Sequence, residues 1–196
     1  MGIILSFEGV DQSGKKTQSK LLVKSLTNEG FKVSYLSFPR YSTLIGKELK
    51  KSLSGKRSYS KQVFHLLMAA NRWEVKKLIV EKKSKTDILI INRYLHSNSA
   101  YGVANGLSNV WLTNLDRGLP FPEKIILLDI PIKVSFVRKS ENRDINEKNL
   151  EYLIKVRKIY LSIAKEYGWK IINGNKSQHE IQNQIFRYVH KIIKNI

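Results

Sequence analysis

A loop bounded by two glycines and closed by a lysine constrains the fold of this chain more than any other feature. The loop has the form G-x-x-x-x-G-K, and it stands between an apolar run that predicts a strand, Ile3–Glu8, and a periodicity that predicts a helix, Thr17–Asn28. The glycines allow the backbone to curl so that successive N–H groups converge on an anion, and the helix adds its positive N-terminal end. A plain turn with a surface lysine is the alternative, but motif and context together favour a phosphate-binding loop (P-loop).

The loop predicts contacts to the phosphates of a nucleotide. We expect these contacts from Gly9, Gln12, Ser13, Gly14, Lys15, Lys16 and Thr17. Lys15 would supply a point charge for the β and γ phosphates. The next position usually carries a Ser or Thr hydroxyl that binds Mg²⁺, but here it is Lys16, and one helical step turns Thr17 away by about 100°. Either the phosphates and water hold most of the Mg²⁺, or Lys16 swings out, or the use of the metal is weakened.

The rest of the chain alternates short apolar runs with longer helical segments, which predicts an α/β fold. We expect the three-layer P-loop NTPase architecture, with a central parallel five-stranded sheet flanked by helices. Further strands are predicted at Lys32–Ser37, Asp87–Ile91, Lys124–Asp129 and Trp169–Ile172, and further helices at Tyr59–Lys83, Pro131–Lys139, Leu150–Tyr167 and Gln178–Ile193. No repeat or Pro/Gly-rich boundary interrupts the pattern, so residues 1–196 are predicted to form a single domain. The polar segment at about 139–148 lacks a core pattern and is predicted to be a mobile lid.

The net charge of +19 favours anionic partners such as nucleotides, nucleic acids or anionic surfaces. The lysines are scattered, however, so a compositional bias spread over solvated faces explains the charge equally well. The absence of cysteine excludes disulfides and thiolate metal sites. No apolar run reaches the roughly 18 residues that span a bilayer, and the segment Met1–Phe7 is interpreted as a strand rather than a signal peptide. A cytoplasmic location is therefore the expectation.

Four segments, taken in order, resemble the thymidylate kinases, and the resemblance covers nearly the whole chain. They are FEGVD through GK and TQ at 7–18, FPRYST with IGK at 38–47, HLLMAANRWE at 65–74, and NRY through Ser97 at 92–97. The resemblance implies an enzyme that transfers a phosphoryl group from ATP to dTMP for dTTP synthesis, a Mg²⁺ cofactor, and a homodimer.

The resemblance also implies residues that bind the acceptor nucleotide. Asp11 would accept a hydrogen bond from the sugar 3′-hydroxyl, although it could simply cap the loop. Arg72 would donate to thymine O4, although a surface arginine paired with a helix neighbour is the alternative. Met68 stands where relatives usually have Phe stacked on the base, and it would cover the ring less rigidly. Tyr101 matches an aromatic that closes over the base, or else belongs to a helix core.

Arg93 follows a buried strand, where ligands of open α/β sheets bind, and its planar fork suits the dTMP phosphate. Phe38 and Arg40 belong to the second segment, and Arg40 is a further phosphate ligand of uncertain register, or a solvated loop arginine. Ser97 would contact the acceptor, or cap a helix. Asn92 stands where the family has an Asp, so it could orient a metal-bound water but adds no negative charge.

The lid is the predicted source of the catalytic cation, because Gln12 is neutral where some relatives place an arginine in the loop. Arg143 is the first choice, followed by Arg138 and Lys139, and closure would bring the cation to the transferring phosphate. The loop Asn173–Ser177 occupies the place of the family's adenine-contacting loop, which makes Asn175 and Lys176 adenine-side residues.

Two other functions stay open at this point. The chain could phosphorylate a different deoxynucleotide, for example dUMP, because Met68 replaces an aromatic residue. It could also be a nucleotide-binding protein with little turnover, or a basic nucleic-acid binder on a kinase scaffold, because of Lys16, Asn92 and the positive charge. The presence of Lys15, Arg72 and Arg93 favours the kinase, so nucleic acid is not an expected partner, and neither is a membrane.

Overall fold

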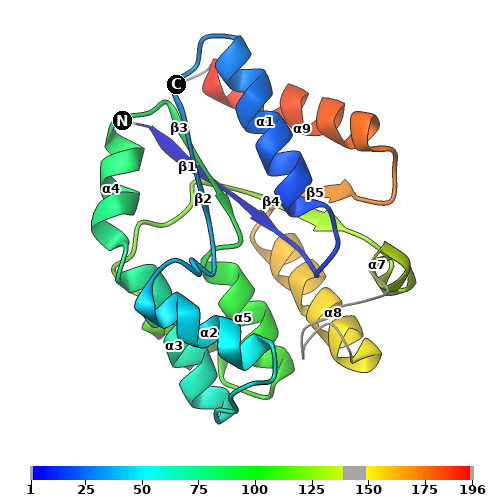
Figure 1. The fold of residues 1–196 in the computed structure, drawn as a ribbon. Coiled ribbons are helices and arrows are strands. Elements are labelled where there is room, and N and C mark those ends of the chain that lie inside the picture. The colour runs from blue at the N-terminus through cyan, green and yellow to red at the C-terminus, as the bar shows by residue number, and fades with distance from the viewer. Residues whose placement is uncertain (1, 139–148, 195–196) are drawn as a thin grey trace.

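The computed structural model describes residues 2–138 and 149–194, and the predicted lid at 139–148, with Lys139 and Arg143, lies outside the described residues. The strands are β1 (Ile3–Glu8), β2 (Val33–Ser37), β3 (Ile88–Asn92), β4 (Lys124–Asp129) and β5 (Lys170–Asn173). They form one parallel sheet in the order β2-β3-β1-β4-β5, with helices on both faces (Figure 1). The predicted three-layer architecture is confirmed.

The helices of the described part follow the strands in the alternating order that a parallel sheet requires. They are α1 (Lys15–Asn28), α2 (Leu44–Leu53), α3 (Lys61–Trp73), α4 (Lys76–Ser84), α5 (Leu95–Ala104), α6 (Asn109–Leu115), α7 (Ile132–Arg138), α8 (Leu150–Glu166) and α9 (Gln178–Ile193). None of these helices has the length and apolar composition needed to cross a bilayer.

Alternating side chains of the strands form two hydrophobic layers, one on each face of the sheet. On one face, Leu5 and Phe7 of β1 pack with α1 and with α9, which contributes Ile181, Ile185 and Val189. On the other face, Ile4 belongs to a cluster with α4 and the start of α5, and a neighbouring cluster joins β4 to α5 and α8. Figure 1 shows α1 and α9 together on one side and α5 and α8 on the other. The sheet is therefore buried on both sides, and its carboxyl edge is left to carry the site.

The single long helix predicted at Tyr59–Lys83 is wrong, because the chain forms α3 and α4 with a break between them. The break lies at Val75, which has φ −116° and ψ 16°. Glu74, just before it, accepts hydrogen bonds from Asn71 Nδ2 at 2.6 Å and from Thr43 Oγ1 at 2.5 Å. These contacts tie the end of α3 to the start of α2, so a tertiary interaction overrides the apolar periodicity of the segment.

No residue range was predicted for three helices, α2, α5 and α6, although the alternatives given for Ser97 and Tyr101 assume a helix where α5 lies. In α5 the buried positions include Asn98, Ser99 and Gly102 beside Leu95 and Tyr101, so polar and small residues occupy the inner face. This composition erases the apolar periodicity by which a helix is recognised. The helix that carries several site residues was therefore invisible to that criterion.

Candidate active site

The P-loop has the backbone geometry that its glycines predict. Gly9 has φ 139°, Gly14 has φ 91°, and a Cβ on Gly9 would stand 2.5 Å from the carbonyl oxygen of Leu128. Helix α1 begins at Lys15, directly after the loop. The ammonium of Lys15 donates to the carbonyl oxygen of Val10 at 2.6 Å and to Ser13 Oγ at 3.2 Å. The loop thus curls around its own lysine and presents the start of α1 to the solvent.

A cavity of about 510 Å³ opens over the loop, and we name it the loop pocket. Its lining includes five cationic side chains and one acidic side chain. They are Lys15, Lys16, Arg93, Arg138 and Lys176, with Asp11 as the acid. A polyanion is the ligand that this balance of charge favours.

Most of the residues predicted to contact phosphate line the loop pocket. These are Gln12, Ser13, Gly14, Lys15, Lys16 and Thr17. Lys176 lines it as well, whereas Asn175 is not part of the lining, and its backbone N–H donates to Asn173 Oδ1 at 2.9 Å. Arg138, the described residue among those predicted for the lid, lines the pocket and donates to the carbonyl oxygens of Gln12 at 3.2 Å and Gly174 at 2.8 Å.

The side chains around the loop pocket do not fit a divalent-cation site. Lys16 is exposed and lines the pocket where a hydroxyl ligand would be needed. Asn92 Nδ2 donates to Ser37 Oγ at 3.0 Å, and Asn92 Oδ1 is buried without a hydrogen-bond partner among the described residues. Within residues 2–138 and 149–194, no group of three or more His, Asp or Glu side chains could hold a metal ion. Asp11 is the one acid of the pocket, and Arg93 and Tyr101 engage it.

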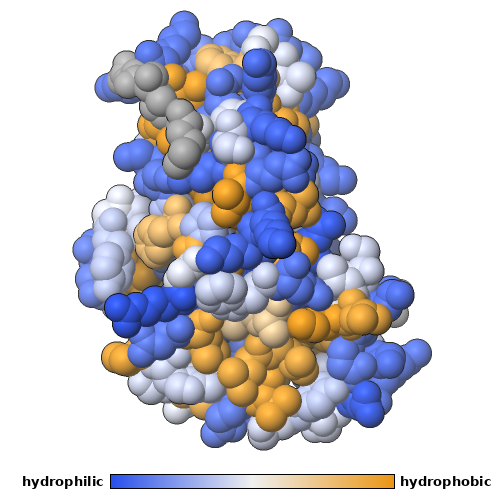
Figure 2. All heavy atoms as spheres, turned by 90° about the vertical axis from the view of Figure 1, so that its left-hand side faces the viewer, coloured by the Kyte–Doolittle hydropathy of each residue, from blue (hydrophilic) through white to orange (hydrophobic). Residues whose placement is uncertain are grey.

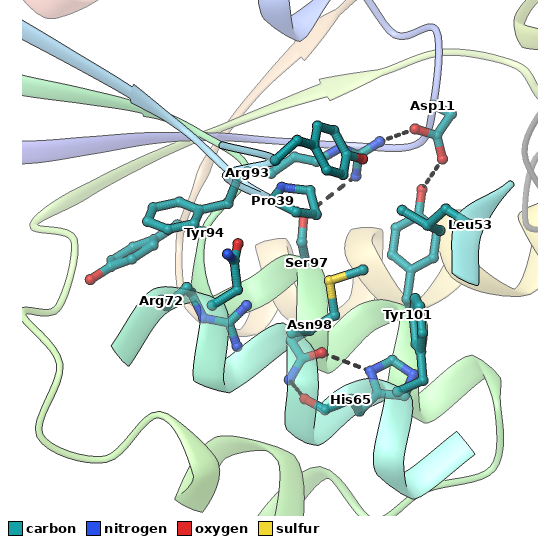
Figure 3. Close-up of a pocket in the computed structure, with 15 residues that line it drawn as sticks. Asp11, Pro39, Leu53, His65, Arg72, Arg93, Tyr94, Ser97, Asn98 and Tyr101 are labelled. Carbon is teal, nitrogen blue, oxygen red and sulfur yellow. Dashed lines mark hydrogen bonds and ion pairs between the residues drawn. The ribbon is translucent and has the colours of Figure 1, made fainter. Parts of the chain in front are cut away.

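A second, smaller cavity of about 110 Å³ is lined by aromatic and apolar side chains, and we name it the aromatic pocket. Figure 3 shows its lining, to which both α3 and α5 contribute side chains. Seven of the residues predicted to bind the acceptor line this pocket, and two of the seven also line the loop pocket. The full predicted set in the lining is Asp11, Phe38, Met68, Arg72, Arg93, Ser97 and Tyr101.

Asp11 and Arg93 line both pockets and form the boundary between them. Arg93 Nη2 is ion-paired with Asp11 Oδ1, and the hydroxyl of Tyr101 donates to Asp11 Oδ2 at 2.6 Å (Figure 3). Burial alone raises the pKa of Asp11, but the positive charges of Arg93 and Lys15 outweigh burial and hold this pKa below its usual value. Asp11 is therefore an ionised acceptor between two cations.

The backbone of Arg93 is unusual, with φ 61° in the left-handed region. Glu8, at the end of β1, stabilises the turn: Oε1 accepts from the backbone N–H of Tyr94 at 2.8 Å, and Oε2 accepts from Ser97 Oγ at 2.7 Å. The hydroxyl of Tyr160 on α8 adds a third donor at 3.2 Å. Burial raises the pKa of Glu8, and the bonds from Ser97 and Tyr94 oppose this rise. Glu8 thereby holds the start of α5, and Arg93 with it, against β1.

Arg72 is buried and enters the aromatic pocket from α3. Its Nε and Nη2 donate to the two carboxylate oxygens of Asp116 at 2.9 and 2.8 Å. The alternative of a surface arginine paired with a helix neighbour is wrong, because the side chain is 3% exposed and its partner lies 44 residues further on. Because Nε and Nη2 of Arg72 donate to Asp116, Nη1 is the guanidinium nitrogen that could donate to a ligand.

The structure leaves two predicted residues in places that differ from their expected roles. Arg40 does not line either pocket; its neighbour Tyr41 lines the aromatic pocket, and Arg40 Nε is buried without a hydrogen-bond partner among the described residues. Ser97 lines the aromatic pocket but is not a helix cap, because it lies inside α5 and donates to Glu8.

Sequence reasoning missed the polar floor of the aromatic pocket. His65 Nδ1 lies 2.7 Å from Asn98 Oδ1, and the other ring nitrogen lies 3.1 Å from Asn105 Nδ2. Burial lowers the pKa of His65, so the ring is neutral near pH 7. The sequence did contain a sign of His65 and Glu8, because each is a polar residue beside apolar residues in the segments at 7–18 and 65–74.

Comparisons with known proteins agree with this geometry. The sequence model of the family described as thymidylate kinase matches residues 7–185. A thymidylate kinase of Plasmodium falciparum is 36% identical over 97% of this chain and 91% of that protein, and a human thymidylate kinase is 33% identical over 94% and 88%. The solved structure of a Candida albicans thymidylate kinase, described as having broad substrate specificity, superposes with a TM-score of 0.83 at 27% identity, covering 97% of this chain and 92% of that one.

Proposed function

The chain belongs to the thymidylate kinase family, and from this premise we propose that the loop pocket binds ATP, that the aromatic pocket binds dTMP, and that the γ-phosphoryl group crosses between them. The chain is accordingly a phosphotransferase of the nucleoside monophosphate kinase class, with ATP as the donor.

The observation that carries this proposal is that the two pockets share Asp11 and Arg93. Phosphoryl transfer requires donor and acceptor to lie in line, with positive charge at the transferring oxygens. A polyanion seated on the P-loop and a nucleotide seated in the aromatic pocket would meet at Arg93. This arrangement supports direct transfer rather than two independent binding sites.

On the acceptor side, we assign the dTMP phosphate to Arg93. Its guanidinium now pairs with Asp11 and approaches Ser97 Oγ at 3.5 Å. A bound phosphate would compete for that guanidinium, and Asp11 would then be available to accept from the sugar hydroxyl. The base would lie between Phe38 and Met68, with Arg72 Nη1 as a donor to its carbonyl oxygen.

On the donor side, the backbone N–H groups at the start of α1 and the ammonium of Lys15 would hold the phosphates. Arg138 reaches over the loop pocket from α7 and would add a charge to the donor. Arg143 stays a prediction for the catalytic cation because it lies outside the described residues. Lys176, in the loop after β5, stands where the adenine end of the donor would leave the pocket.

Turnover of ATP with dTMP tests this function directly. The full chain should release ADP when ATP, Mg²⁺ and dTMP are all present, and omission of dTMP should abolish release. Lys15→Ala should remove the activity, whereas Lys20→Ala, at an exposed position five residues further along α1, should retain it. Nucleotide binding without ADP release would instead favour the low-turnover binding protein.

The acceptor can be identified from initial rates over a panel of monophosphates. We expect dTMP to have the highest kcat/KM, with dUMP second because the two bases differ only by a methyl group. A methyl group in an apolar pocket contributes about 1–3 kcal/mol to discrimination, so the expected preference is about 10- to 200-fold. Equal rates with dTMP and a purine monophosphate would show a broader acceptor range.

We also infer that the chain forms a homodimer through the outer face of α3. Val63, Leu66 and Trp73 are exposed at helical spacing, and Val110 of α6 is exposed as well. Figure 2 shows apolar surface gathered on the lower half of the face where α3 lies. An apolar interface would have to outweigh the repulsion between two chains of charge +19.

Light scattering tests the dimer. Leu66→Glu should give a monomer, whereas Gln184→Glu, which adds the same charge at an exposed position of α9, away from α3, should not. A monomeric wild-type chain would refute the inference. A cytoplasmic location stays a prediction.

A further inference from the structure

Two positions around the loop pocket carry nitrogen donors where a metal site needs oxygen ligands. Lys16 follows the P-loop lysine and is exposed at the start of α1, and Asn92 ends β3 on the other side of the pocket. A hydroxyl and a carboxylate at these positions could each coordinate a metal through oxygen or accept a hydrogen bond from its bound water. An ammonium can only donate, and an amide can donate as well as accept. The two departures therefore change the chemistry of the pocket in the same direction.

The amide of Asn92 uses only one of its two polar atoms in a hydrogen bond among the described residues. Its Nδ2 is assigned to Ser37 Oγ at 3.0 Å, and Oδ1 is buried without a partner among the described residues. The two ends of an amide are interchangeable in such an assignment, and Ser37 Oγ can donate as readily as it accepts. Turning the amide over would satisfy Oδ1 with Ser37 and place a donor N–H group, instead of an acceptor, at the other position of an amide that lines the loop pocket. A carboxylate at this position could not make that change.

The charge of the loop pocket points the same way. Five cationic side chains line it against the single acid Asp11, which is already paired with Arg93. Metal-free ATP carries a charge of about −4, and a bound Mg²⁺ halves that charge. The cations of the pocket can neutralise the phosphates without the metal, and Lys16 is the one placed where the metal ligand is missing.

We propose that the loop pocket is built to bind a metal-free nucleoside triphosphate, with Lys16 and Asn92 donating to phosphate oxygens in place of a bound Mg²⁺. The proposal rests on the assignment of ATP to this pocket. It identifies Lys16 and Asn92 as the residues that determine which ionic form of the donor the chain prefers. The nucleoside triphosphate can then bind to the pocket with or without Mg²⁺.

Equilibrium binding of a non-hydrolysable ATP analogue measures this preference. Dissociation constants are determined by calorimetry with EDTA and with excess Mg²⁺, at equal ionic strength because the chain is highly charged. The ratio of the metal-free Kd to the Mg²⁺ Kd is the readout, and it does not depend on turnover. We expect a ratio below about 3 for the wild-type chain.

Matched variants separate Lys16 from the general charge. The double variant Lys16→Ser with Asn92→Asp should raise the ratio at least about tenfold, which is the scale of a lost charge-assisted hydrogen bond. Lys20→Ser removes the same charge one helical turn away and should leave the ratio within about twofold. Circular dichroism confirms that each variant is folded.

A wild-type ratio above about 3, or an increase of less than tenfold in the double variant, overturns the proposal. An equal effect of Lys20→Ser overturns it as well, because the general charge would then be responsible. If the wild-type chain binds the analogue in neither form, the assignment of ATP to the loop pocket fails along with it. Tight binding that strongly prefers the Mg²⁺ form leaves the kinase assignment intact and rejects this inference alone.

Discussion

Removal of the Asp116 carboxylate should strongly destabilise the chain, because the carboxylate neutralises a buried guanidinium. Arg72 and Asp116 are 3% and 6% exposed and are joined by two parallel hydrogen bonds of 2.9 and 2.8 Å. Burial raises the pKa of Asp116, and the charge of Arg72 opposes this rise. Deleting one partner of a buried pair leaves the other charge without compensation, which costs about 3–5 kcal/mol.

The chain contains its own control for this prediction. Arg157 and Asp129 make the same two-bond geometry at 2.7 and 2.8 Å, but their side chains are 34% and 21% exposed. Water replaces a lost partner there, so Asp129→Ala should cost only about 1 kcal/mol or less. The two variants therefore compare burial at nearly constant geometry.

Urea and thermal unfolding measure the difference. For a domain of this size, about 3–5 kcal/mol lowers Tm by roughly 6–20 °C, so Asp116→Ala should melt well below Asp129→Ala. Adding Arg72→Met to Asp116→Ala should recover part of the loss, because the unpaired charge is then gone. The reasoning is refuted if Asp116→Ala costs no more than Asp129→Ala. Because Arg72 lines the aromatic pocket, Asp116→Asn should also raise KM for dTMP.

Three further predictions follow from the site. Arg93→Lys keeps the charge but loses the fork, so kcat/KM for dTMP should fall about 10- to 150-fold, the value of one charge-assisted hydrogen bond; a change below threefold would remove Arg93 from the acceptor phosphate. Met68→Phe should lower KM for dTMP by a few-fold, because a ring stacks on the base with less loss of conformational freedom; an unchanged or raised KM would show that Met68 does not cover the base. Burial lowers the pKa of His96 to about 4 from 6.5. The unfolded chain then binds more protons there, so stability should fall as pH drops below about 6.5, by about 2 kcal/mol between pH 7.5 and pH 5. Urea unfolding at the two pH values should show this loss reduced in His96→Phe, and an equal loss in the variant would contradict the assignment.

The sequence by itself determined the features that depend on neighbours along the chain. Gly9 and Gly14 were predicted to allow a curled loop, and they have the positive φ values that such a loop needs. The continuous apolar run of β3 was predicted to be a strand buried on both faces, and all five of its residues are buried. Backbone preference and hydrophobic periodicity are local properties, so a single sequence is enough to recognise them.

The tertiary structure alone decided which charges meet. Arg72 finds Asp116 44 residues away, and Arg93 finds Asp11 at a separation of 82. No periodicity marks such partners, because the energy of a buried charge depends on what the fold brings within hydrogen-bond reach. The same is true of Glu8, which reads in the sequence as the end of a strand. Only the packing of β1 against α5 and α8 makes it the acceptor that holds the turn at Arg93.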